Sequence, residues 1–270
     1  MKTIIITGTD GFIGSNLKTL LTPHFQIIEI NENIIDLNYR EIIQSTFSNN
    51  EIECVFHVGA CSDTLETNVN YMMLVNYEFT KFLADVCNAW AVPLVYSSSA
   101  ANYGDNDIHP SNLYGWSKYA GEDAVINRNG IALRYYNVYG PGEEHKGRMS
   151  SVALQSFIKH KNGETSKLFP LNPRRDFVYI KDVISANLYA YENYHKLSGS
   201  YYEVGSGDAR TFEDVLNIMN IPFEYHSEDI IPKGYQFYTC SMKDSWMSGW
   251  EPSYNLEKGL THYLKYLNEH

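Results

Sequence analysis

The sequence predicts an α/β fold, in which a doubly wound, Rossmann-like parallel sheet is joined to a smaller, mixed C-terminal lobe. One observation behind this prediction is an apolar run at residues 1–7 that leads through a glycine-rich turn into a helix-like stretch. Another is the continued alternation of strand-like and helix-like segments along the first half of the chain. Further strands are expected at residues 26–30, 54–58, 93–96, 131–135 and 201–205, and helices at 39–48, 71–90 and 114–126.

The composition excludes several classes of protein. The 270 residues carry a formal net charge of −11, which argues against non-specific binding of nucleic acid. No apolar stretch approaches the roughly 18 residues that a membrane span needs, and the N-terminus lacks the pattern of a signal peptide. The four cysteines (Cys54, Cys61, Cys87 and Cys240) are scattered, so we expect reduced thiols, a cytoplasmic protein and no metal site.

The first glycine-rich turn has the spacing Gly-x-x-Gly-x-x-Gly, at Gly8, Gly11 and Gly14. Gly8 allows the tight turn, Gly11 lets the backbone approach a pyrophosphate, and Gly14 lets the following helix pack on the strand. The N-terminus of that helix would face the phosphates. A glycine-rich turn without a ligand is the alternative. This spacing is typical of short-chain dehydrogenase/reductase proteins and predicts a dinucleotide site.

About a hundred residues later, Tyr114 and Lys118 stand four positions apart on an expected helix. Side chains at this spacing project from one face of a helix. An ammonium group beside the phenol stabilises the phenolate, so a group with an ordinary pKa of about 10 can act as a base near neutrality. Tyr-x-x-x-Lys is unspecific by itself, but together with the glycine turn it predicts a redox enzyme.

Four stretches resemble ADP-L-glycero-D-manno-heptose 6-epimerases, nucleotide-sugar epimerases of the extended short-chain dehydrogenase/reductase (NAD-dependent epimerase/dehydratase) family. They are Gly59–Thr64 with Tyr71–Met73, Ser97–Gly104, Arg134–Gly147 and Arg175–Val183. Gly59-Ala60-Cys61, Tyr71-Met72-Met73 and His145-Lys146-Gly147 discriminate this family, whereas the Arg-Asp-Phe-Val segment is shared by many extended members. The resemblance covers nearly the whole chain and implies lipopolysaccharide-precursor chemistry.

The resemblance implies a transient hydride transfer from the sugar to a bound nicotinamide, followed by its return to the other face of the keto sugar. Tyr114 would act as one acid/base, Ser99 would hydrogen-bond the reacting oxygen, and Lys118 would hold the nicotinamide ribose. Lys146 falls at the position of the family's second acid/base. Its alternative is a solvated loop charge, and the alternative for Ser99 is a turn cap. The predicted catalytic residues are therefore Ser99, Tyr114, Lys118 and Lys146.

The binding residues that the resemblance and the glycine turn imply form two sets. The predicted cofactor-binding residues are Gly8, Asp10, Gly11, Phe12, Ile13, Gly14, Asn31, Asp36, Leu37, Val58, Gly59, Ala60, Tyr114, Lys118 and Val138. The predicted substrate-binding residues are Cys61, Ser62, Asn137, Arg148, Gln155, Phe169, Arg175 and Tyr235. Arg175 would hold the diphosphate bidentately, or else form an ion pair with Asp176. Asn76 matches the family's helix asparagine, with a structural role as the alternative.

Residues 1–140 are accordingly interpreted as the dinucleotide-binding domain, with 176–207 returning to the main sheet. Residues 141–175 and 208–270 are interpreted as the substrate-binding lobe, because proline, glycine and polar clusters interrupt the pattern after Pro141.

Two features depart from the resembled family. The family holds NADP, yet the segment after the second strand is acidic, with Glu29, Glu32 and Asp36, which suits the ribose hydroxyl of NAD. We expect one tightly bound NAD or NADP per chain, with NAD bound at least as readily. In the sugar pocket, Arg148 replaces a small hydroxyl residue, Gln155 replaces a histidine, and the Phe169–Arg174 loop is shorter, so the sugar or nucleotide could differ.

Alternative functions remain open at this point. A UDP-sugar 4-epimerase would share Ser99, Tyr114 and Lys118 but would not require Lys146. A 4,6-dehydratase needs acid groups where this chain has Ala100-Ala101-Asn102, and a net reductase would consume external NAD(P)H. A non-catalytic dinucleotide sensor would usually lose the Tyr/Lys pair. The expected partner is a nucleotide sugar, and a homo-oligomer is the family habit.

Overall fold

The computed structural model describes residues 1–31, 38–59, 61–104, 109–228 and 236–270. The chain divides into two compact units. Unit 1 contains Met1–Arg134 and Ile184–Tyr202, and unit 2 contains Tyr135–Val183 and Glu203–His270. The boundaries expected from the sequence, at residues 140, 175 and 207, separate a part that binds the cofactor from a part that binds the substrate. These boundaries stay predictions.

The main sheet has six strands in the order β2-β1-β3-β4-β5-β9. The strands are β1 (Thr3–Thr7), β2 (Gln26–Ile30), β3 (Ile52–His57), β4 (Leu94–Ser99), β5 (Ile131–Tyr135) and β9 (Ser200–Val204). β1 pairs in parallel with both β2 and β3, and β3 pairs in parallel with β4. The strand expected at 201–205 does join the main sheet, and the predicted doubly wound fold is confirmed.

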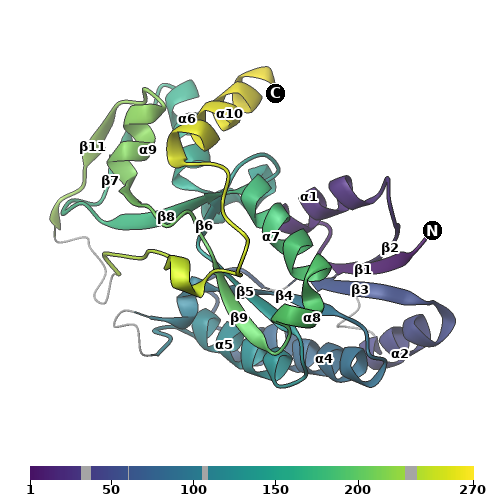
Figure 1. The fold of residues 1–270 in the computed structure, drawn as a ribbon. Helices are drawn as coiled ribbons and strands as arrows, with labels where there is room; N and C mark the ends of the chain where they lie inside the picture. The colour runs from purple at the N-terminus through teal and green to yellow at the C-terminus, as the bar shows by residue number, and fades with distance from the viewer. Residues whose placement is uncertain (32–37, 60, 105–108, 229–235) are drawn as a thin grey trace. The chain divides into compact units, whose positions relative to one another are not determined.

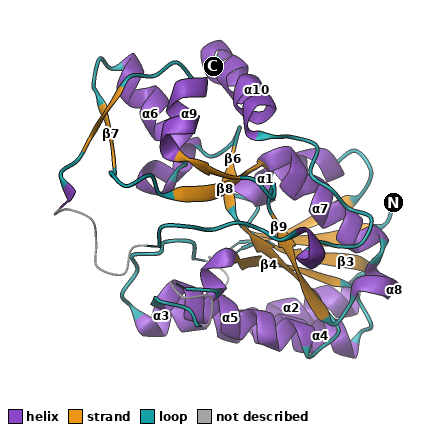
Figure 2. Cartoon of the chain, turned by 60° about the vertical axis from the view of Figure 1, so that its left-hand side comes forward, coloured by secondary structure: helices purple, strands orange, loops and turns teal. Residues whose placement is uncertain are grey.

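Helices cover both faces of this sheet. They are α1 (Phe12–Leu21), α2 (Tyr39–Asn49), α3 (Val69–Met73), the π-helical turn η2 (Leu74–Glu78), α4 (Phe79–Ala89), the 3-10 turn η3 (Ala100–Asn102), α5 (Leu113–Ile126), α7 (Ile180–Glu192) and α8 (Tyr194–Leu197). Figures 1 and 2 show α1 and α7 on one face and α2, α4 and α5 on the other. All five residues of β1 are buried, as expected for a central parallel strand.

The core on the α2/α4/α5 face forms because apolar residues recur at helical spacing opposite apolar strand residues. Ile5 and Val55 from the sheet pack with Ile43, Leu83 and Val125 from the three helices in one buried cluster. The same burial leaves polar strand residues on this face without water, so they must find partners within the protein.

Unit 2 holds two small sheets and their helices. The sheets have the orders β10-β8-β6 and β11-β7. Their strands are β6 (Asn137–Tyr139), β7 (Ser166–Leu168), β8 (Arg174–Tyr179), β10 (Ala209–Thr211) and β11 (Phe223–Tyr225), and the helical segments are η4 (Glu144–Met149), α6 (Val152–Lys161), α9 (Phe212–Ile218), η6 (Lys243–Ser245) and α10 (Leu256–Glu269). β8 pairs antiparallel with β10 and parallel with β6, so the predicted mixed lobe is confirmed.

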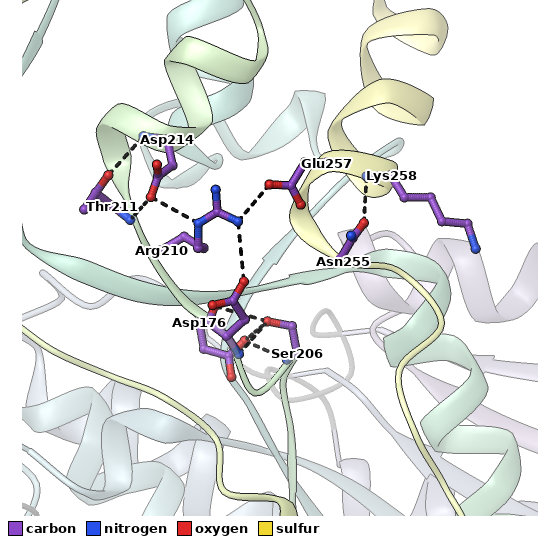
Figure 3. Close-up of polar contacts among 9 residues, drawn as sticks. Asp176, Ser206, Arg210, Thr211, Asp214, Asn255, Glu257 and Lys258 are labelled. Atoms are coloured by element: carbon purple, nitrogen blue, oxygen red, sulfur yellow. Dashed lines mark hydrogen bonds and ion pairs between the residues drawn. The ribbon is translucent and has the colours of Figure 1, made fainter.

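Polar contacts organise the loops of unit 2 (Figure 3). The fully buried Asp176 carboxylate accepts hydrogen bonds from the N–H and hydroxyl groups of Ser206 and Ser241. Arg210 contacts Asp214 of α9 and Glu257 of α10 at 3.2 and 2.8 Å. The hydrogen bonds of the buried Asp176 carboxylate hold the loops more strongly than the ion pairs of Arg210 do. A charge removed from water must be fully hydrogen-bonded, whereas exposed ion pairs contribute little to stability.

The helix expected at 71–90 differs from the prediction in one respect. It runs through Val69–Ala89 but contains the π-helical turn η2. Asn76 lies within that turn, and its buried side chain bonds the backbone of Cys61 in the loop after β3. No described helix is both long enough and apolar enough to cross a membrane.

Gly14→Ala tests the tightness of the first turn. An added Cβ would lie 2.1 Å from the Gly8 carbonyl oxygen, so α1 must move away from β1. We expect the free energy of unfolding to fall by roughly 2–3 kcal/mol, measured by urea denaturation. Thr19→Ala, on the exposed side of the same helix, is the control and should change it by less than about 0.5 kcal/mol. Equal effects of the two substitutions would contradict the packing argument.

Candidate active site

The predicted residues of unit 1 gather where the strands of the main sheet end. Gly8 follows β1, Gly59 follows β3, and Ser99 ends β4. The chain leaves β1 toward β2 on one side, while β3 lies on the other side. Ligands of open α/β sheets bind at such a switch point, outside the carboxyl ends of the strands.

The glycine turn leaves no room for side chains. Gly8 has φ +70°, and an added Cβ there would lie 2.4 Å from the Cα of Gly59. The Gly59 N–H donates to both the carbonyl oxygen and Oγ1 of Thr7, at 3.0 and 2.9 Å. α1 begins after Gly11, which has no side chain to cap the first N–H groups. These features fit the pyrophosphate of a dinucleotide held at a helix N-terminus.

The remaining predicted cofactor residues of unit 1 surround this turn. Asn31 accepts hydrogen bonds from Thr9 N and Oγ1 at 2.9 and 3.1 Å, next to Glu29. Hydrogen bonds from Lys18 and Thr9 lower the pKa of Glu29, so this carboxylate stays charged. Phe12 is buried, Ile13 and Val58 are half-buried and Asp10 is exposed, while Asp36, Leu37 and Ala60 lie outside the described residues.

Tyr114 lies in the first turn of α5 and Lys118 in the next. Asn112 caps the helix by accepting from Gly115 N at 2.8 Å. A Cβ on Gly115 would lie 2.6 Å from the Ala101 carbonyl oxygen, so this glycine lets α5 press against η3. Ser99, just before η3, hydrogen-bonds Tyr114 and also caps Ala101 N at 3.1 Å. The Ser99 hydroxyl therefore both caps the turn at Ala101, as the structural alternative expected, and contacts the phenol of Tyr114.

Burial dominates the protonation of this pair. It raises the pKa of Tyr114, against the hydrogen bond from Ser99, which lowers it. Burial also lowers the pKa of Lys118 to about 7, opposed by the charge of Glu122 one helical turn away. The expected lowering of the Tyr114 pKa is thus not found, because burial of the phenol outweighs its hydrogen bond with Ser99. The Lys118 Nζ lies 4.5 Å from the Tyr96 ring centre.

Asn76 connects the loop after β3 to the catalytic helix. Its Oδ1 accepts from Cys61 N at 2.8 Å, and its Nδ2 donates to Cys61 O at 3.0 Å and to Ser117 Oγ at 2.9 Å. Ser117 Oγ in turn donates to the Tyr114 carbonyl at 2.7 Å. The Asn76 side chain is fully buried and holds the backbone of Cys61 beside the predicted site, and the role that the resemblance implies for it stays a prediction. Ser62 is exposed beside it.

Lys146, in unit 2, lies on the 3-10 segment η4. It is half-buried, and its N–H donates to the Glu143 carbonyl at 3.0 Å. Burial lowers the pKa of Lys146, while the charge of Glu143 opposes that shift. The Glu143 carboxylate is fully buried and accepts from Ser151 N and Oγ, which anchors the loop to the start of α6.

The two departures from the family pattern contact each other. Gln155 Nε2 donates to the carbonyl of Arg148 at 3.2 Å and to that of Ser150 at 2.7 Å. The Arg148 side chain is exposed. Gln155 therefore fastens the loop that carries Lys146 and Arg148 onto α6.

The other predicted substrate residues that the structure describes in unit 2 lie on its strands or directly after one of them. Asn137 and Val138 begin β6, and Asn137 pairs with Phe177 of β8. Arg175, also on β8, lies 5.8 Å from the Phe212 ring centre, and its Nη1 donates to the Arg174 carbonyl. Phe169 packs against the His226 ring, with centres 5.9 Å apart. Tyr235 lies outside the described residues.

Sequence reasoning missed several buried polar residues of unit 1, among them Thr7, His57 and Thr80. A histidine that follows the apolar run Cys54–Phe56 was the available signal. Among the described residues, His, Cys, Asp and Glu do not gather in groups of three or more that could hold a metal ion.

Comparisons with known proteins agree with this geometry. Residues 4–205 match the NAD dependent epimerase/dehydratase family. An ADP-L-glycero-D-manno-heptose-6-epimerase of Brachyspira hyodysenteriae is 33% identical over 98% of both chains. One from Cupriavidus pinatubonensis is 37% identical over 80% of this chain and 77% of its own. The crystal structure of the Helicobacter pylori ADP-L-glycero-D-manno-heptose-6-epimerase superposes with a TM-score of 0.86 at 26% identity, covering 100% of this chain and 97% of that one.

The chain therefore belongs to the NAD-dependent epimerase/dehydratase family. Within that family it is similar to ADP-L-glycero-D-manno-heptose-6-epimerases over nearly its whole length. The predictions of family resemblance, of an NAD-dependent nucleotide-sugar epimerase and of a nicotinamide cofactor are confirmed.

Lys118 should make the NAD-free protein more stable as the pH rises from 7. Its pKa is about 7 when folded and 10.5 when unfolded, so the unfolded chain binds more protons between these values. The free energy of unfolding should rise by up to about 1.4 kcal/mol per pH unit relative to Lys118→Met, measured by urea denaturation from pH 7.5 to 9.5. The exposed-lysine control, Lys159→Met, should follow the unmodified protein. Parallel pH profiles for unmodified and Lys118→Met proteins would contradict the shift.

Proposed function

We propose that this protein epimerises an ADP-heptose at C6 by transient hydride transfer to a tightly bound NAD. The observation that carries this proposal is the contact of Ser99 with Tyr114, one helical turn before Lys118, at the strand ends that hold the glycine turn. The names of the similar proteins support the choice of sugar and nucleotide.

The cofactor, when bound, supplies the nicotinamide ring that oxidises and then re-reduces the sugar carbon. Tyr114 takes the proton of the C6 hydroxyl, and Ser99 holds that oxygen in line. Lys118 holds the nicotinamide ribose, and its nearness favours the phenolate whenever the lysine is protonated. The Glu29 carboxylate, kept charged by Lys18 and Thr9, supports NAD over NADP, because a 2′-phosphate would meet like charge.

Lys146 is proposed as the second acid/base. A reaction that returns hydrogen to the opposite face of a keto sugar needs a proton donor for the second orientation. The lowered pKa of Lys146 brings its ammonium closer to the range where a general acid works at neutrality. Arg175 is proposed for the diphosphate, with Cys61, Ser62, Asn137 and Phe169 around the sugar nucleotide. A cytoplasmic location and a homo-oligomeric state are proposed with it.

A proton NMR time course with ADP-D-glycero-D-manno-heptose and no added nicotinamide tests the reaction. We expect the C6 epimer beyond one equivalent per chain, without deuterium at C6 in D2O, because the returned hydrogen comes from the substrate. Tyr114→Phe should reduce the rate by about 10²–10⁴-fold, because the proton acceptor is lost. Tyr119→Phe, on the exposed side of the same helix, should not change it.

Two results would redirect the proposal. Turnover of a UDP-hexose but not the ADP-heptose by NAD-loaded protein would assign a UDP-sugar 4-epimerase. Deuterium incorporation at C6 would mean that the carbon loses a proton to solvent, and it would reject the redox mechanism.

Lys146→Met separates the two acid/base roles. It should lower kcat by about 10²-fold or more, because one direction of proton transfer loses its partner, and leave NAD content unchanged. Lys159→Met is the matched control on an exposed helical turn. If Lys146→Met kept the full rate, Tyr114 would serve both faces and the second role would be withdrawn.

A further inference from the structure

His57 is a fully buried polar residue at the end of β3, and the proposed chemistry does not use it. It is 1% exposed, and its neighbours Thr7, Thr80 and Asn76 are 2%, 0% and 0% exposed. The register of the sheet pairs Thr7, the last residue of β1, with His57, the last residue of β3, and pairs His57 with Tyr96 inside β4. A polar row at this depth must satisfy its own hydrogen bonds.

Both ring nitrogens of His57 have threonine partners. Nδ1 lies 2.7 Å from Thr7 Oγ1, and Nε2 lies 2.8 Å from Thr80 Oγ1. Thr80 Oγ1 also donates to the Asn76 carbonyl at 2.8 Å, so its single hydrogen is already used. It must therefore accept from His57, which makes Nε2 the protonated nitrogen.

The other side of the ring gives the same assignment. Thr7 Oγ1 accepts from Gly59 N–H at 2.9 Å, so its own hydrogen points to another acceptor. Nδ1 of the neutral Nε2–H tautomer is that acceptor. The opposite tautomer would leave a threonine hydrogen without a partner and deprive the Asn76 carbonyl of its donor. Burial and the nearby Lys118 charge lower the pKa of His57 to about 3, which agrees with a neutral ring.

We propose that His57 is a positioning residue, the centre of a one-directional chain of hydrogen bonds from Gly59 N–H through Thr7, His57 and Thr80 to the Asn76 carbonyl. One end holds the Gly59 turn against Gly8, where the dinucleotide cradle has no spare room. The other end holds Asn76, which bonds Cys61 and, through Ser117, the backbone of Tyr114. The chain thus couples the cofactor cradle to the catalytic helix.

The first test measures the tautomer in the NAD-loaded protein and does not depend on the identity of the sugar. Long-range ¹⁵N–¹H NMR of histidine-labelled protein should show His57, assigned by its absence in His57→Gln, as the Nε2–H tautomer from pH 5 to 8. An Nδ1–H tautomer, or titration within that range, would overturn the proposal.

The second test removes single links. Thr7→Val keeps the side-chain shape but loses the hydroxyl, and it should weaken NAD binding by about 10-fold, measured by calorimetry on nucleotide-free protein. Thr7→Ser keeps the hydroxyl and should restore the affinity to within about 3-fold. Thr3→Val, a buried threonine at the far end of the same strand, is the control and should have no effect. Equal affinities for the valine and serine variants of Thr7 would refute the coupling.

The third test rests on the proposed function and reads the distant end of the chain. Thr80→Val should lower kcat for the ADP-heptose by about 10-fold with KM nearly unchanged, and Thr80→Ser should restore it. An inactive unmodified enzyme would reject the substrate assignment but leave the tautomer and NAD results intact. A KM effect without a kcat effect would place His57 outside the positioning of Tyr114.

Discussion

The close approach of the Gly8, Gly14 and Gly59 backbones is the constraint on which the cofactor side of the site depends. An added Cβ on Gly8 would overlap Gly59, and one on Gly14 would overlap Gly8. Because no side chain separates these segments, α1, β1 and the turn after β3 are held at backbone contact. The hydrogen bonds from Gly59 N–H to both acceptor oxygens of Thr7 then fix that turn at the carboxyl end of β1.

Burial shapes the chemistry of the same region. Lys118 is buried and Tyr114 is half-buried, so both pKa values shift toward the neutral forms, and Glu122 partly offsets this for Lys118. His57 is neutral for the same reason. The fold therefore keeps these titratable groups buried at a cost in stability.

Much of unit 1 could be predicted from sequence, because local signals determine it. The spacing of Gly8, Gly11 and Gly14 dictates a strand-turn-helix, and the spacing of Tyr114 and Lys118 dictates one helical face. The partnership of His57 with Thr7 and Thr80 could not be predicted, because it depends on strand register and on which helix covers the sheet. Likewise, the pairing of Gln155 with the Arg148 carbonyl joins a helix to a loop whose path no periodicity reveals.

The π-helical turn at Leu74–Glu78 changes how the whole α3–α4 segment must be interpreted. A π turn amounts to one residue inserted into an α-helix, and each residue of an α-helix advances about 100° around the axis. A helical wheel drawn without a break from Val69 to Ala89 is therefore out of phase after the turn by about that angle. Val69 is exposed before the turn, Leu74 within it and Trp90 beyond α4. Their spacing in the sequence therefore does not by itself place them on one continuous stripe of the helix. If the sequence were aligned with a regular α-helix that lacks the extra residue, the side chains beyond the turn would be placed about 100° away from their directions in this structure. Asn76 would then no longer face Cys61.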